Sequence, residues 1–154
     1  MPTAWVVIAQ TDLNDYLVSA QVDALAAAAL APGQTNPFAR VMPDVMARIR
    51  AAIAGCQRNR VSATANSVPP ELKWAACLLT IEAMQTRVVG LVLTEEQKGM
   101  IRDAKDELKL IRECESVVVT PTDPVVPDVQ RGGNIVVVTS SENEATPQQT
   151  SGLL

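Results

Sequence analysis

The chain has 154 residues, which is typical of a single domain, and 47% of them are hydrophobic, enough to bury a core. It contains no histidine, which excludes the commonest catalytic acid–base groups. The net charge of −4 is uneven: residues 1–114 hold 12 basic and 12 acidic side chains, whereas residues 115–154 hold one and five. Neither part has the basic surplus of a general nucleic-acid-binding protein.

The first half of the chain predicts three helices. Residues 11–17 and 19–30 form two short ones, and Pro32 and Gly33 follow in a loop. A third is centred on PDVMARIRAAIAG, with Pro43 at its first position and Gly55 as its C-terminal cap. The polar residues that follow, 57–68, read as a loop.

Two further helices follow. Residues 69–87 begin with two prolines, and their apolar side chains spread over more than one face, which predicts a central helix. After a connection at 88–93, Thr94 and Gln97 form a capping-box pattern that opens the clearest amphipathic helix of the chain. We therefore expect a mainly α protein, a compact bundle of four to five helices over residues 1–115.

The cysteine pattern indicates no disulfide framework. The three residues, Cys56, Cys77 and Cys114, are odd in number, lie far apart and include no CxxC pair. Cys77 lies in the apolar run WAACLLTI and is expected to be a buried hydrophobic residue.

After residue 115 the pattern becomes β-prone. Residues 116–141 contain two valine-rich runs separated by prolines, and residues 142–154 are polar and expected to be flexible. An isolated hairpin is marginal in water, so this arm has three alternatives: it folds back on the helices, pairs with another chain by strand addition, or stays disordered. The second alternative predicts a set of partner-binding residues, namely Val117, Val118, Val119, Ile135, Val136, Val137 and Val138.

Arginines are concentrated between residues 40 and 60, against a single acid, Asp44. They are Arg40, Arg48, Arg50, Arg58 and Arg60. One interpretation is a solvated face with charges that complement a helix dipole; the other is contact with DNA or with an acidic protein surface. Arg48 and Arg50 are two residues apart, about 200° around a helix, so both cannot face one partner.

No catalytic or cofactor-binding set is recognisable. The carboxylate clusters fall at helix starts or on exposed faces, and Gly132–Gly133 lacks the lysine and helix of a phosphate loop. No apolar run approaches the ~20 residues that span a bilayer, and the start MPTAWVVIAQ lacks the features of a signal peptide. We expect a soluble, non-enzymatic protein made in the cytoplasm, with no cofactor, no metal and no membrane contact.

The order of these parts resembles the head–tail adaptor (connector) proteins of tailed bacteriophages, of the Mu-like prophage type. The resemblance covers roughly residues 5–112 and is centred on PELKWAA at 70–76. It implies a ring, commonly a dodecamer, that lies between the portal and the stopper or tail protein and encloses the packaged DNA. It further implies that the C-terminal arm docks on the portal or on neighbouring subunits, that the arginines face portal acids or the DNA lumen, and that the protein is part of the virion after assembly in the host cytoplasm.

Two other functions remain open. A helix-turn-helix DNA-binding protein, either a regulator or a small terminase-like subunit, would use residues 11–30 or 37–55. That reading needs a recognition helix rich in Arg, Lys, Asn or Gln, which SAQVDALAAAAL is not. The third possibility is a plain helical scaffold that dimerises through its last helix.

Overall fold

The computed structural model describes residues 1–29, 33 and 35–124, and most of these residues are helical. Along the chain the elements are β1 (Val6–Val7), η1 (Gln10–Tyr16), α1 (Ser19–Ala29), α2 (Pro37–Ala54), β2 (Ser67–Val68), η2 (Pro70–Leu72), α3 (Lys73–Met84) and α4 (Glu95–Arg112), where η denotes a 3-10 helix. The prediction of a mainly α bundle is therefore confirmed. The second valine-rich run and the polar tail lie outside the described residues.

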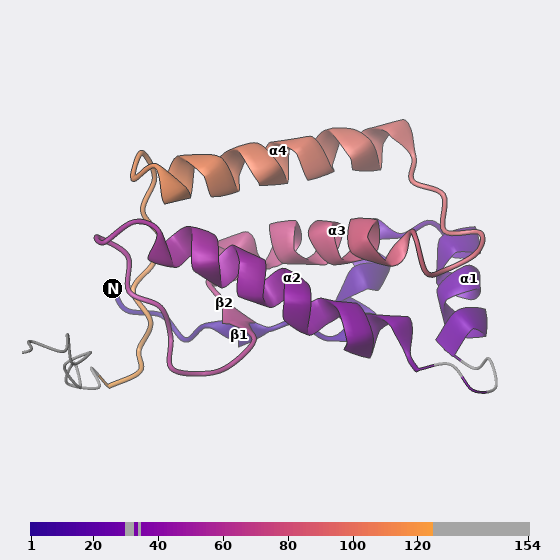
Figure 1. Cartoon of the computed structure of the whole chain (residues 1–154), viewed down its shortest axis with the longest axis horizontal. Coiled ribbons are helices and arrows are strands. Elements are labelled where there is room, and N and C mark those ends of the chain that lie inside the picture. The colour runs from indigo at the N-terminus through magenta and orange to yellow at the C-terminus, as the bar shows by residue number, and fades with distance from the viewer. Residues whose placement is uncertain (30–32, 34, 125–154) are drawn as a thin grey trace, which may run out of the picture. The chain divides into compact units, whose positions relative to one another are not determined.

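Helix α3 is the centre of the bundle. It contacts α2, α4 and η1, and its buried residues include Leu78, Ile81 and Met84 on one side and Ala75 and Thr80 on others. The three long helices run in alternating directions, so that α2 and α4 end on the same side, while α1 stands across the opposite end (Figure 1). A helix that is apolar on several faces must be covered on all of them, which is why it lies in the middle.

Helix α2 begins earlier than the sequence predicts. Asn36 is its N-cap, with a side-chain oxygen that accepts a hydrogen bond from the Phe38 N–H at 2.9 Å, and Pro37 occupies the first turn. Pro43 is therefore inside the helix and not at its start, contrary to expectation. The missing N–H costs about 3 kcal/mol in a helix interior, and the extra turns offset this by burying Phe38 and Val41.

Helix α4 follows the prediction closely. Thr94 and Gln97 form the expected capping box, with the Gln97 N–H donating to the Thr94 Oγ1 at 3.2 Å. Ile101 is buried on the inner face, whereas Met100 is 39% exposed. The inner stripe of the helix thus runs through Ile101, Ala104 and Ile111.

The first part of the valine-rich arm belongs to the body. The Val119 N–H donates to Glu71 Oε1 at 2.7 Å, its carbonyl accepts from the Trp5 indole at 3.1 Å, and the Thr3 N–H donates to the Thr120 carbonyl at 2.9 Å. The compact unit consequently extends to Asp123, past the boundary expected at residue 115. Strand β1, which directly follows Trp5, pairs antiparallel with β2. Both strands are too short for sequence periodicity to predict them.

Cys56 and Cys114 form a disulfide, contrary to the expectation of three separate thiols. It joins the residues that follow α2 and α4, two helix ends on the same side of the bundle (Figure 1). Gly55 permits this approach: a Cβ there would lie 2.9 Å from Cγ of Arg112. The odd count was misleading because the third residue, Cys77, is a buried free thiol, as the sequence predicts.

We expect Cys56→Ser/Cys114→Ser to lower the free energy of unfolding by about 4 kcal/mol, the chain-entropy value for a loop of this length. The cross-link spans a sequence separation of 58 and so restricts a large part of the unfolded chain. Chemical denaturation of the oxidised protein, the reduced protein and the double variant measures the effect, and the reduced protein should unfold like the double variant. Equal stability of the oxidised protein and the double variant would contradict it.

Candidate functional site

Arg50 serves the fold of its own chain. Its guanidinium donates to the carbonyls of Ser62 at 2.6 Å, Thr64 at 3.0 Å and Ser67 at 2.9 Å, and it lies over the Trp5 ring. Burial lowers the pKa of Arg50 below its ordinary value, and the nearby Asp123 carboxylate opposes this. One planar group with several donors thereby fixes the 57–68 loop beneath α2, and it is not free to contact a partner in the way the sequence suggested.

Arg60 and Asp123 hold the end of the described chain. Arg60 donates to the Asp123 backbone carbonyl, and the Asp123 carboxylate accepts from the Ser62 hydroxyl and from the Ala63 N–H. The Ser62 hydrogen bond is the main cause that lowers the pKa of Asp123 below its usual range. Arg60 is therefore another arginine whose guanidinium binds a backbone carbonyl of its own chain.

The remaining three arginines lie apart from one another. Arg40 borders a hollow of about 470 Å³ together with Thr35, Pro37 and Arg87. Arg48 borders a different one, between α2, α3 and α4, and Arg58 is an exposed loop residue. The structure thus does not bring the five arginines into one binding surface, and Arg87, which the sequence pattern did not single out, is the arginine next to Arg40.

The valines proposed as partner-binding residues fall into two groups. Backbone groups of Val118 and Val119 are bonded within the chain, since the Val118 N–H also donates to Asn59 Oδ1 at 3.2 Å. The side chains of Val117 and Val119 remain exposed, so their contact with a partner stays a prediction. Ile135, Val136, Val137 and Val138 lie outside the described residues.

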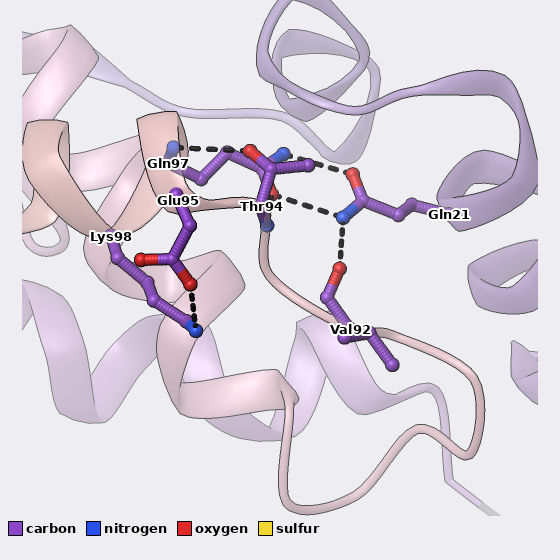
Figure 2. A network of polar contacts seen from close by, with 6 residues as sticks. All are labelled: Gln21, Val92, Thr94, Glu95, Gln97 and Lys98. Atoms are coloured by element: carbon purple, nitrogen blue, oxygen red, sulfur yellow. Dashed lines mark hydrogen bonds and ion pairs between the residues drawn. The ribbon is translucent and has the colours of Figure 1, made fainter.

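A buried pair of amides joins α1 to the start of α4. Gln21 and Gln97 donate to each other's side-chain oxygens at 3.0 and 2.9 Å (Figure 2). Gln97 also donates to the Tyr16 carbonyl at 2.6 Å, and Gln21 donates to the Val92 carbonyl. These hydrogen bonds connect η1, α1 and the segment before α4 through the same two side chains, and so they fix the arrangement of this end of the bundle.

That end of the bundle combines exposed apolar side chains with carboxylates. We call it the acidic end. Its exposed apolar residues are Val18 (51% exposed), Val89 (97%), Val92 (70%) and Met100 (39%). Two of these residues, Val18 and Met100, line a hollow of about 490 Å³ that is bordered by three carboxylates, those of Asp15, Glu95 and Glu96. Glu95 forms an ion pair with Lys98 at 2.7 Å, seen in Figure 2.

A groove with a basic rim lies between α2, α3 and α4. We call it the basic groove. Its apolar floor is formed by Val45, Ile49, Leu79, Ala83 and Leu108, and its volume is about 360 Å³. A second hollow of about 340 Å³ shares Lys105 and Leu108 with it and adds Lys109 and Arg112. The carboxylates on this rim are Glu82, which pairs with Lys105 at 2.7 Å, and Asp106.

The described part of the chain offers little for metal binding or nucleophilic catalysis. Within residues 1–29, 33 and 35–124 no three His, Cys, Asp or Glu side chains gather as a metal site would require. Burial raises the pKa of the Cys77 thiol to about 11, so it is a poor nucleophile at neutral pH. None of the described helices is long and apolar enough to cross a membrane.

Comparison with protein-family models, with curated proteins and with solved structures found no match to this chain.

We expect Arg50→Ala to lower the free energy of unfolding by about 2–3 kcal/mol, because the carbonyls of the 57–68 loop lose their donor. Arg58→Ala is the matched control, and a change within about 0.5 kcal/mol is expected for this exposed arginine. Urea unfolding of both variants provides the measurement. Similar values for the two would mean that Arg50 is free for another role.

The amide pair makes a separate prediction. Gln97→Leu removes the bonds between the two amides and leaves the Tyr16 carbonyl without its donor, so we expect it to cost about 2–3 kcal/mol, more than the roughly 1 kcal/mol expected for Thr94→Ala, which removes only a helix cap. Adding Gln21→Leu should cost less than the same change in the wild type, because the bonds between the two amides are then already lost. A double-mutant cycle in urea measures this, and additive losses would contradict a coupled pair.

Proposed function

We propose that this protein is a structural subunit of a homo-oligomeric ring, a head–tail adaptor of a tailed bacteriophage located between the portal and the stopper or tail protein. The observation that carries the proposal is the pair of outward-facing surfaces on one small helical body, the acidic end and the basic groove. Contiguous apolar side chains bordered by charge are typical of surfaces that bind other proteins. The resemblance in helix order to adaptor proteins supports the head–tail ring as the kind of assembly.

The virion location and the remaining partners belong to the same proposal. The portal would receive one face of the ring, the stopper or tail protein the other, and packaged DNA would pass through the channel. Residues 125–154, which hold three acidic residues and one basic residue, would supply the docking arm. Because the compact unit ends at Asp123, such an arm can engage a partner without unfolding the helical body.

A helix-turn-helix DNA-binding protein is the alternative. It is less well supported, because α1 presents alanines where a recognition helix needs Arg, Lys, Asn or Gln, and because Arg50 in α2 is bonded to its own chain. Salt-sensitive binding to duplex DNA by the isolated protein would favour this alternative.

Mixing the purified chain with the portal ring encoded in the same genome tests the proposal. We expect electron microscopy to show a second ring on the portal, and we expect deletion of residues 125–154 to weaken binding at least about tenfold, equivalent to about 1.4 kcal/mol. The deletion should leave thermal unfolding of the body unchanged. Absence of any complex would refute the proposed function, and undiminished binding by the truncated chain would remove the arm as its docking element.

A further inference from the structure

We infer that the basic groove receives the acidic end of a second copy of this chain, so that subunits associate head to tail. The inference rests on the proposed ring function and specifies the contact that would build the ring. A heterologous contact between two different surfaces of one chain gives a closed ring if the rotation between subunits closes, and a filament if it does not.

The charges of the two surfaces are complementary. The groove rim carries Arg48, Lys105, Lys109 and Arg112 against the carboxylates of Glu82 and Asp106, an excess of two positive charges, four minus two. Among the described residues, the hollow at the acidic end is bordered by three carboxylates and by no basic side chain. Lys98 pairs with one of the carboxylates nearby, and Arg40 and Arg87 border a separate hollow. Two surfaces of the same charge would repel each other, whereas surfaces of opposite charge attract each other and favour this pairing over others.

The shapes also suit each other. The acidic end has a projecting apolar residue, Val89, which is 97% exposed beside Gly90, whose backbone has φ +89°. The groove offers an open apolar floor that includes Leu79 and Leu108. Placing a valine against this floor removes apolar surface from water on both partners, and the surrounding charges orient the contact.

The described residues of one copy cannot bring the two surfaces together. The carboxylates of Glu95 and Glu96 lie in the first turn of α4, and Lys109 and Arg112 lie in its last turn. The 18-residue helix holds these two ends about 27 Å apart. A second copy supplies the required charge and apolar group at both surfaces.

Charge reversal tests the inference. One variant, Glu95→Lys/Glu96→Lys, makes the acidic end basic, and the other, Lys109→Glu/Arg112→Glu, makes the groove rim acidic. We expect each variant alone to self-associate at least about tenfold more weakly than the wild type, and an equal mixture of the two to associate again, because each then meets an opposite charge. Sedimentation velocity, alone and with the portal ring, measures the association, and circular dichroism verifies that each variant is folded.

Three further variants protect the test from misfolding and from general charge effects. Val89→Ser removes an apolar contact at an almost fully exposed position, so it should weaken association without affecting stability. Asp103→Lys and Arg58→Glu reverse exposed charges outside both surfaces and should associate like the wild type.

The outcomes separate this inference from the proposed function. Reversed variants that still form rings on the portal would overturn the head-to-tail contact and leave the adaptor function standing. A mixture that associates only as far as a closed dimer would support the contact and refute the ring. A mixture that stays monomeric, or a wild type that never self-associates with or without the portal, would overturn the inference.

Discussion

Burial of α3 on nearly all sides is the constraint on which the rest of the structure depends. Leu78, Ile81 and Met84 of this helix are buried together with Ala75 and Ala76, and the helix contacts α2, α4 and η1. Because no single neighbour can cover such a helix, η1 and the two longer helices must all pack around it. The polar groups that surround this core, from the Gln21–Gln97 pair to Arg50, then fix the short segments that close its ends.

Patterns that repeat along the sequence predicted the fold well, and contacts between distant residues were not predictable in the same way. The periodicity of α4 and its Thr94–Gln97 box are local, so both could be read directly. The predicted start of α2 was wrong because Pro43 and Pro37 both suit a first turn, whereas the Asn36 cap and the packing of Phe38 favour the earlier one. The disulfide was missed since its cysteines meet only when the ends of α2 and α4 do.

The arginines between residues 40 and 60 show the same limit of sequence-based prediction at the candidate site. Contact with DNA or with an acidic protein surface was one interpretation of the five guanidiniums, but the direction of each depends on its neighbours in the fold. Arg50 faces three backbone carbonyls of residues 62–67, and its several N–H groups donate to all of them. The two interaction surfaces, in contrast, combine residues from separate helices, so no single sequence window contains them.

The disulfide and the Asp123 anchor also have a mechanical consequence. A pulling force on the C-terminal end of the chain would first load the bonds that hold Asp123 to the 60–63 segment, then the bonds of residues 118–120, and then the cross-link between Cys114 and Cys56. The disulfide would transmit the force covalently to the end of α2, so that α4 would not unwind from its last turn. A subunit tethered through its tail could therefore bear tension while its helices stay in register.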